Sequence, residues 1–301
     1  GPGTCRHEVR GCETRVKTTP DADHDCRTLH EAAQLICEDP NRRGSLLTFG
    51  RAGQLVMTGD LHGHLRNFEK LQRFCDLEHS PARVVVLHEL IHQEPEPPTG
   101  VDTSIDLLVA AAAWKCRFPD NVFFLQSNHE LSQLRNHEIT KGGRCVLADF
   151  ERGVHLRYGR GAPAVLEAVN DYIASLPLGA RLANGIFLAH SLPDGFYADH
   201  FDWSVFDRIP TAADLEPGGA AYALVWGRFQ TPEAVELFAR QLGVEWFIVG
   251  HTPQEMGYLR MSRLFVLASE HSHGVFLPLD LRRRYTGDEL ERSIRKFVSV
   301  A

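Results

Sequence analysis

Short apolar runs alternate with amphipathic stretches along most of this chain. The runs occupy residues 53–58, 83–87, 121–125, 185–189, 245–249, 264–268 and 275–279. Between the first two runs, Phe68, Leu71 and Phe74 share one helical face over 67–77, and an alanine-rich stretch follows at 102–116. Buried strands that alternate with helices are typical of an α/β protein. Thr231-Pro232-Glu233 opens a further helix with an N-cap, a proline and an early acid.

The two ends of this pattern suggest how the chain is organised. The first 27 residues are polar and aperiodic, and apolar spacing over 28–39 predicts one helix that ends before Pro40. We therefore expect an N-terminal lead-in with one helix over 1–48 and a main domain over 49–301. Residues 131–184 are less regular, and we interpret them as a helical insertion of that domain.

Polar residues follow directly after several of the apolar runs. They are Asp60 and His62, Asn128 and His129, His190, and His251. In open α/β sheets, ligands bind beyond the carboxyl ends of the strands, so these distant positions are expected to converge. Carboxylate, amide and imidazole groups are the ligands of catalytic metal pairs. The pattern therefore predicts a metallohydrolase.

Composition narrows the setting in which this chemistry is expected. The chain has 301 residues and a net charge of −7, which disfavours a general nucleic-acid binder. We expect no membrane partner, because no apolar run approaches the roughly 20 residues of a transmembrane helix. Without an evident signal peptide, and with seven cysteines that form no C-x-x-C pair, a cytoplasmic protein is the expectation. An extra metal site among cysteines and histidines of the first 40 residues is a less favoured alternative.

Four motifs resemble those of a known family. Residues 59–63, 127–130, 190–193 and 250–253 resemble, in order, the GDxHG, GNHE, HGGxP and GH signatures of calcineurin-like metallophosphoesterases. Residues 117–125 and 224–227 are similar to segments of its serine/threonine phosphoprotein phosphatase branch. The resemblance implies a four-layer fold, a β-sandwich flanked by helices, with two divalent ions of manganese, iron or zinc. It also implies hydrolysis of phosphate monoesters, of a phosphoprotein or a small phosphorylated molecule, by a hydroxide bridging the ions.

The resemblance also implies a role for each motif residue. Asp60, His62 and His251 would hold one ion, and Asn128 and His190 the other. Glu89 stands where the family has its bridging aspartate, one methylene longer but still an anionic oxygen ligand. His129 would protonate or stabilise the leaving oxygen.

Departures from the family pattern lie beside these residues. His92, Gln93 and Gln126 occupy positions where the family has an aspartate that orients the catalytic histidine and two arginines that clamp phosphate. His92 is thus a candidate catalytic residue and Gln93 a candidate substrate-binding residue, although an amide cannot replace a bidentate guanidinium. Arg228 is a candidate replacement clamp. The departures leave an alternative open, a metal-binding scaffold or phospho-ligand binder with weakened turnover.

Two further patterns offer less favoured candidates. His88-Glu89-Leu90-Ile91-His92 matches the H-E-x-x-H motif of zinc peptidases, which requires both histidines on one helix. The segment follows a strand-like run and precedes three prolines, so this alternative is less favoured. Glu270, His271 and His273 lie between the last two apolar runs and are weaker candidates for lining the site.

Overall fold

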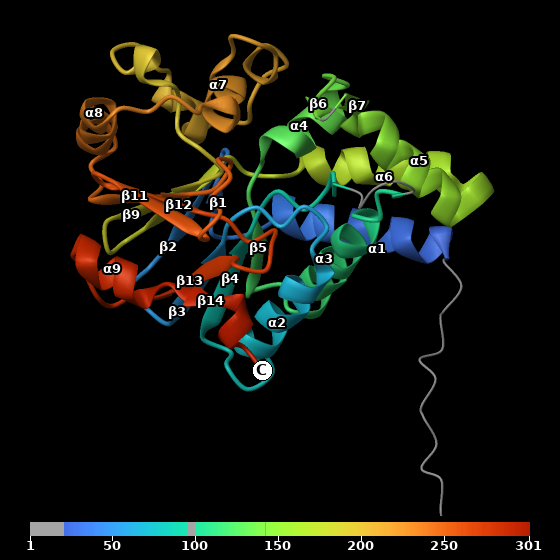
Figure 1. The fold of residues 1–301 in the computed structure, drawn as a ribbon, viewed down its shortest axis with the longest axis horizontal. Helices are drawn as coiled ribbons and strands as arrows, with labels where there is room; N and C mark the ends of the chain where they lie inside the picture. Colours follow the sequence, from blue (N-terminus) through green and yellow to red (C-terminus); the bar gives the residue numbers. More distant parts are fainter. Residues whose placement is uncertain (1–20, 95–99, 142) are drawn as a thin grey trace, which may run out of the picture.

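Two β-sheets packed face to face, with helices on their outer faces, form the core of the molecule (Figure 1). The computed structural model describes residues 21–94, 100–141 and 143–301. One sheet has seven strands in the order β1-β2-β8-β9-β10-β12-β11, and the other has five in the order β14-β13-β3-β4-β5. The predicted α/β sandwich flanked by helices is therefore confirmed.

The strands of the seven-stranded sheet are β1 (Arg42–Arg43), β2 (Leu46–Phe49), β8 (Gly179–Leu182), β9 (Ile186–Ala189), β10 (Trp246–Val249), β11 (Tyr258–Met261) and β12 (Leu264–Leu267). Those of the five-stranded sheet are β3 (Gln54–Thr58), β4 (Arg83–Leu87), β5 (Val122–Phe124), β13 (Val275–Asp280) and β14 (Arg295–Lys296). A separate small hairpin consists of β6 (Thr140–Lys141) and β7 (Arg144–Cys145). Strands β3, β4 and β5 run parallel, as do β9, β10 and β12. The carboxyl ends of each set therefore lie on the same side of their sheet.

Helices cover both outer faces of the sandwich (Figure 1). One apolar cluster joins the outer face of the five-stranded sheet to α1 (Ala22–Cys37), α2 (Leu65–Cys75), α3 (Ile105–Arg117), α5 (Val146–Tyr158) and α6 (Ala162–Ala174). The seven-stranded sheet packs against α7 (Ala220–Trp226) and α8 (Pro232–Leu242). The remaining helices are α4 (Asn128–Arg135) and α9 (Gly287–Ser293), with short 3-10 turns at Gly159–Gly161, Gly195–Tyr197, Trp203–Asp207, Ala213–Leu215 and Phe297–Ser299.

The apolar core between the two sheets fixes their position relative to each other. Leu55, Met57 and Val86 from one sheet meet Ile248 and Phe265 from the other, and all five are fully buried. Complete burial of one such side chain contributes about 1.5–3 kcal/mol. A backbone bridge between residues 60 and 268 joins the chain after β3 to the chain after β12. The ends of β3, β4 and β5 therefore have a fixed position relative to the ends of β9 and β10.

The N-terminal region is more closely integrated than its sequence suggests. Helix α1 begins six residues before the expected start, because the Asp21 side chain caps it by accepting the His24 N–H at 3.1 Å. The helix packs against α6 and α3, and β2 pairs with β8. The expected boundary between residues 48 and 49 thus falls inside β2. The remaining part of the predicted lead-in, residues 1–20 with their cysteines and histidine, lies outside the described residues.

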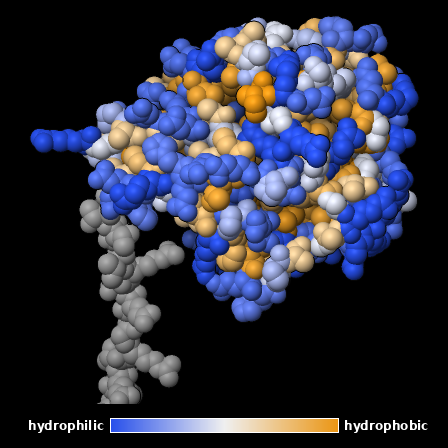
Figure 2. All heavy atoms as spheres, turned by 180° about the vertical axis from the view of Figure 1, so that it is seen from behind, coloured by the Kyte–Doolittle hydropathy of each residue, from blue (hydrophilic) through white to orange (hydrophobic). Residues whose placement is uncertain are grey.

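Apolar side chains on the surface occur in small groups. On the face drawn in Figure 2, hydrophilic residues form most of the surface, and apolar ones lie between them. The most exposed large apolar side chains are Leu156, Phe196, Ile209, Phe229, Met256 and Val298. Within the described ranges, every helix is too short or too polar to cross a bilayer.

Candidate metal centre

The carboxyl ends of five parallel strands bring the expected polar residues together. Strand β3 leads into Asp60 and His62, β4 into His88 and Glu89, β5 into Asn128 and His129, β9 into His190, and β10 into His251. Apart from His62, which is half-buried, all of these side chains are buried. The convergence predicted from strand ends is therefore found in the structure.

Glu89 lies at the centre of this cluster. Its Oε1 is 3.7 Å from His62 Nε2 and 3.6 Å from His129 Nε2, while its Oε2 is 3.4 Å from His190 Nε2. Neither carboxylate oxygen has a hydrogen-bond partner with normal distance and angle among the described residues, although Glu89 is only 1% exposed. A buried carboxylate without hydrogen bonds is strongly unfavourable. A cation on each side of this carboxylate would remove that penalty.

Burial and neighbouring acids raise the pKa of both central carboxyl groups. For Glu89, burial raises the pKa well above its usual value, and the charges of Glu130 and Asp60 raise it further. For Asp60, burial is again the main cause of the raised pKa, followed by the charge of Glu270. Several acids that cannot all ionise easily in one buried volume are typical of a site that binds cations.

A tight group of possible ligand atoms lies on the Oε2 side of Glu89. Asn128 Oδ1 is 2.7 Å from His190 Nε2 and 2.9 Å from His251 Nδ1, and the two ring nitrogens are 3.1 Å apart. The family resemblance implies a site for His251 beside Asp60 and His62, but the structure places its imidazole beside Asn128 and His190. The His251 backbone N–H instead donates to the Asp60 carboxylate, at 2.9 Å from Oδ1. With a φ of 70°, His251 directs its backbone N–H toward Asp60 and its imidazole toward Asn128.

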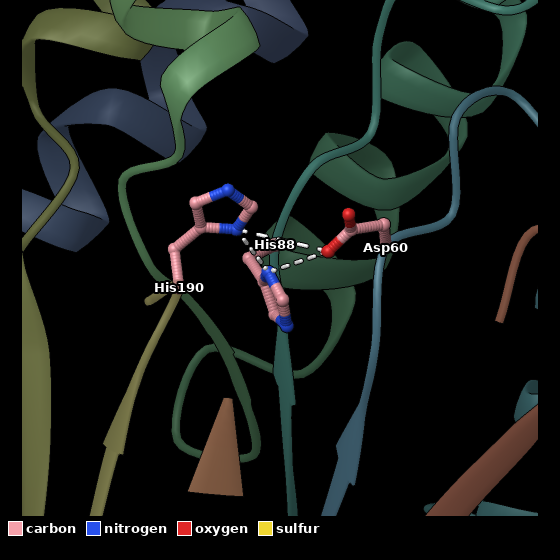
Figure 3. Close-up of side chains that lie close together, drawn as sticks. All are labelled: Asp60, His88 and His190. Atoms are coloured by element: carbon pink, nitrogen blue, oxygen red, sulfur yellow. Dashed lines mark hydrogen bonds and ion pairs between the residues drawn. The ribbon is translucent and has the colours of Figure 1, made fainter. Parts of the chain in front are cut away.

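His88 also belongs to the cluster, although the sequence indicated it only as part of the H-E-x-x-H motif. Its Nδ1 lies 2.9 Å from His190 Nδ1 and 3.6 Å from Asp60 Oδ1, and these three side chains converge (Figure 3). A side chain at Gly250 would overlap Asp60 and His88, so the glycine permits this close approach. The available signal was a histidine directly after a buried strand, the same signal that identified His190.

The H-E-x-x-H segment is not helical, so the zinc-peptidase interpretation is wrong. Residues 88–92 follow β4 as irregular backbone, and the two histidines face different neighbours. The segment is held by Glu130, whose Oε1 accepts the Leu90 N–H at 2.6 Å and whose other oxygen accepts the Ser127 hydroxyl. Satisfied hydrogen bonds of this kind hold a buried loop in one conformation.

His92 contacts His129 through the His129 ring nitrogen that faces away from Glu89. The two Nδ1 atoms are 2.9 Å apart, and His92 Nε2 is 2.9 Å from Gln133 Oε1. Burial lowers the pKa of His92 to about 4 and that of His129 well below its usual value. The structure thus places a neutral imidazole where the resemblance implies an orienting carboxylate.

Backbone strain is concentrated at the same residues. Seven described residues other than glycine have positive φ, and four of them lie in this cluster: His62 (41°), Glu89 (51°), His92 (62°) and His251 (70°). Such conformations cost about 1–3 kcal/mol each and persist where the surrounding structure enforces them. These strained conformations therefore lower the stability of the fold but fix the directions of the four side chains.

The rim of the cluster differs from its centre. Arg228 is exposed and its Nη1 donates to the His251 carbonyl oxygen at 3.3 Å. Burial lowers the pKa of His251 to about 3, and the charge of Arg228 contributes. Gln93 Oε1 accepts a hydrogen bond from the Thr103 hydroxyl at 2.9 Å, so this side chain is bonded to an exposed residue outside the cluster.

Other sequence candidates bond away from the cluster. Gln126 Nε2 donates to the Ile173 carbonyl oxygen at 3.1 Å. His271 Nε2 contacts the Gln254 carbonyl oxygen at 2.8 Å, and its Nδ1 accepts the His273 backbone N–H. Of the weaker candidates, Glu270 influences the site through its charge on Asp60.

Comparison with known sequences identifies the family. The sequence profile described as calcineurin-like phosphoesterase matches residues 54–255, more than half of the chain. The chain belongs to this family. Among curated proteins, none matches the sequence significantly.

Solved structures with a similar fold are phosphatases. A protein serine/threonine phosphatase from Saccharomyces cerevisiae, described as similar to human phosphatase PP5, has a TM-score of 0.68 at 16% identity, covering 94% of this chain and 91% of its own. A cold-active protein-tyrosine phosphatase from a psychrophilic Shewanella species has a TM-score of 0.54 at 14% identity, covering 88% and 84%. At these identities the likeness shows the fold, which matches the calcineurin-like phosphoesterase assignment.

Proposed function

We propose that this calcineurin-like phosphoesterase hydrolyses phosphate monoesters at a centre of two divalent metal ions bridged by Glu89. One observation carries the proposal. Each carboxylate oxygen of Glu89 is buried, lacks a hydrogen bond of normal geometry in the described structure, and lies near different imidazole nitrogens, Oε1 near His62 and His129 and Oε2 near His190. A carboxylate between two cations accounts for this arrangement, because each ion would offset half of the anionic charge.

The available atoms suit two ions of manganese, iron or zinc. On one side, His62 Nε2 and Glu89 Oε1 would act as ligands, with Asp60 as the second carboxylate. The other ion would be held by Glu89 Oε2 together with Asn128 Oδ1, His190 Nε2 and His251 Nδ1. Mixed oxygen and imidazole ligands are used by all three metals. Bound there, a metal pair lowers the pKa of water and offsets the charge of the phosphate.

His129 is the residue placed to handle the proton of the leaving group. Its Nδ1 contacts His92 Nδ1, so its Nε2 faces the centre, 3.6 Å from Glu89 Oε1. Proton transfer from such a side chain typically contributes 10²–10⁴-fold to a rate. A carboxylate behind the ring stabilises its protonated form, and the neutral ring of His92 does this less well. His129 is therefore protonated less often here than it would be with an aspartate next to its Nδ1.

Substrate binding in this proposal depends on Arg228. Its guanidinium is exposed and lies against the His251 carbonyl oxygen, at the rim of the cluster. Charge-assisted hydrogen bonds from arginine suit phosphate oxygens. The greater structural likeness to a serine/threonine phosphatase supports phosphoserine and phosphothreonine as substrates, and the protein-tyrosine phosphatase makes phosphotyrosine the comparison to test.

The test combines metal counting with turnover. Wild type, Glu89→Gln and the control Glu31→Gln, an exposed acid on α1, are loaded with manganese, iron or zinc. They are assayed on p-nitrophenyl phosphate and on phosphoserine, phosphothreonine and phosphotyrosine peptides. We expect two ions and turnover in wild type and control, and at least a 100-fold loss in Glu89→Gln, since even partners behind a ligand are worth about 10–100-fold. A Glu89→Gln protein with two ions and full activity would refute the bridge.

A second candidate function is supported by the two glutamines. Gln93 is bonded to Thr103 and Gln126 to Ile173, so neither amide contacts the cluster. With fewer groups to clamp phosphate, the centre would bind metal and phosphate yet turn substrates over slowly. Two bound ions and retained binding of inorganic phosphate, without hydrolysis of any ester in the panel, would favour this metal-binding scaffold.

A further inference from the structure

His88 has a proton arrangement that its neighbours determine. The side chain is 1% exposed and its Nε2 lies 2.9 Å from the Thr58 carbonyl oxygen. A carbonyl oxygen only accepts hydrogen bonds, so Nε2 of His88 carries the proton. In a neutral ring the other nitrogen, Nδ1, then has a free lone pair.

The lone pair of His88 determines the tautomer of His190. His190 Nδ1 lies 2.9 Å from His88 Nδ1, a normal distance for an N–H···N hydrogen bond. Because His88 Nδ1 accepts, His190 Nδ1 must donate, and the lone pair of His190 is on Nε2. Figure 3 shows His190 Nδ1 turned toward His88 and Asp60, with the other ring nitrogen pointing away from them. That nitrogen lies 2.7 Å from Asn128 Oδ1 and 3.4 Å from Glu89 Oε2.

We infer that His88 is a positioning residue that holds His190 in the Nδ1–H tautomer, so that the Nε2 lone pair of His190 points into the metal site. The inference deepens the proposed function and rests on it for the metal. A metal-bound histidine commonly donates its other N–H to a carboxylate or carbonyl, which sets its tautomer and ring orientation. In this chain an imidazole takes that place. A carboxylate there would add a further negative charge beside Asp60, whereas a neutral ring adds none.

The same arrangement occurs a second time in this segment. His92 Nε2 lies 2.9 Å from Gln133 Oε1, and Gln133 Nε2 donates to Glu151 at 3.4 Å, which sets the direction of the amide. His92 therefore also carries its proton on Nε2 and accepts from His129 Nδ1 at 2.9 Å. Residues 88 and 92 thus support two different site histidines, one on each side of Glu89.

A rival arrangement uses the same three side chains differently. Asp60 Oδ1 lies 3.6 Å from His88 Nδ1 and 3.7 Å from His190 Nδ1, close enough for all three to hold an ion of their own. In that case His190 would carry its proton on Nε2 and donate it to Asn128. The two arrangements predict opposite tautomers for His190, and the rival also predicts a third ion.

The experiment reads the tautomer and the metal independently. Long-range ¹H–¹⁵N spectra of histidine-labelled wild type, before and after zinc loading, report which nitrogen of His190 is protonated. His88→Asn keeps an acceptor near the position of Nδ1, and His88→Leu, of similar size, removes it. His79→Leu, on an exposed residue, is the control. Thermal unfolding of each variant verifies that it is folded.

We expect Nδ1–H in wild-type His190 both with and without zinc. We also expect zinc affinity about 10–100-fold lower in His88→Leu, a change of a few-fold in His88→Asn, and none in the control. Nε2–H in His190, a third ion lost from both His88 variants, or equal affinity in Leu and Asn variants would overturn the inference. Failure of the proposed function would look different, as wild type that binds no divalent ion, and the spectra of that protein would still show whether His88 sets the tautomer.

Discussion

The centre of the site and its rim follow different physical constraints. At the centre, Glu89, Asn128, His190 and His251 are buried, and each lies within 3.4 Å of at least one of the others. At the rim, Arg228 is exposed and Gln93 is half-buried and bonded to Thr103. A buried polar group without a partner is costly, so each central residue depends on the others, whereas a rim residue can change alone. Substitutions at the rim are therefore expected to alter turnover without altering metal binding.

The departures from the family pattern fall along this division. Glu89 keeps an anionic oxygen where the family has an aspartate, so the charge at the centre is retained. Gln93 and Gln126 replace guanidiniums, and both amides are bonded elsewhere. The centre has thus kept the chemistry of a metal site, while Arg228 is the one arginine that the described structure places against a candidate ligand, at the His251 carbonyl oxygen.

The largest effect should come from double variants that remove ligands of one proposed ion or of both. If His251 and Asn128 hold the same ion, the double variant His251→Ala/Asn128→Ala keeps the other one. His62→Ala/Asn128→Ala would then keep neither, because each change removes a ligand of a different ion. Loss of a ligand should lower affinity by at least about 100-fold. Metal content after dialysis and calorimetric titration give the count.

The alternative grouping predicts the opposite result. If His251 shares an ion with His62, as the family resemblance implies, His251→Ala/His62→Ala keeps one ion and His251→Ala/Asn128→Ala keeps none. That outcome would contradict the geometry in which His251 Nδ1 lies 2.9 Å from Asn128 Oδ1. Glu31→Gln again serves as the unaffected reference.

A smaller effect is expected at the rim. Arg228→Ala should raise KM for p-nitrophenyl phosphate about 10-fold or more, since hydrogen bonds to a charged group contribute about 1.5–3 kcal/mol, and should leave the metal content unchanged. Arg228→Lys should recover part of the loss through charge alone. Steady-state kinetics and metal analysis check both points, with the exposed Arg240→Ala as the matched control. An unchanged KM would mean that the phosphate is held by the centre without this guanidinium.

Strand ends were predictable because burial sets them. The apolar run 83–87 is β4 itself, and its three last residues are fully buried. The residues that follow such strands must lie at the sheet edge, which is why Asp60, Asn128 and His190 could be grouped from sequence. The same logic applies to His88, which directly follows β4.

Other features depend on contacts that periodicity does not report. The grouping of His251 follows from a positive φ, which separates the direction of its N–H from that of its ring. The early start of α1 depends on the Asp21 cap. Strand β8 breaks the pattern because Gly179 and Arg181 interrupt its apolar residues, and it is stabilised by pairing with β2 and β9.

The smallest expected effect tests whether burial alone explains the raised pKa of Glu89. Asp102 is a second buried carboxylate, 1% exposed, whose Oδ1 accepts the Ser104 N–H at 2.8 Å and whose Oδ2 has no partner in the described structure. Burial raises its pKa from 3.8 to about 6. Its charged form is therefore disfavoured in the folded state, so the penalty is full above pH 6 and disappears as the pH falls below the unfolded pKa.

Asp102→Asn should consequently stabilise the protein above pH 6, by up to about 3 kcal/mol for a shift of about two pKa units, and have little effect near pH 4. Urea unfolding between pH 4 and 8, with and without zinc, measures this. The gain should be the same in both conditions, because none of the candidate ligands is bonded to Asp102 in the described part of the chain. Glu89→Gln should also stabilise the metal-free protein but abolish its stabilisation by zinc. If zinc stabilises Glu89→Gln as much as wild type, Glu89 is merely a second buried acid of the Asp102 kind.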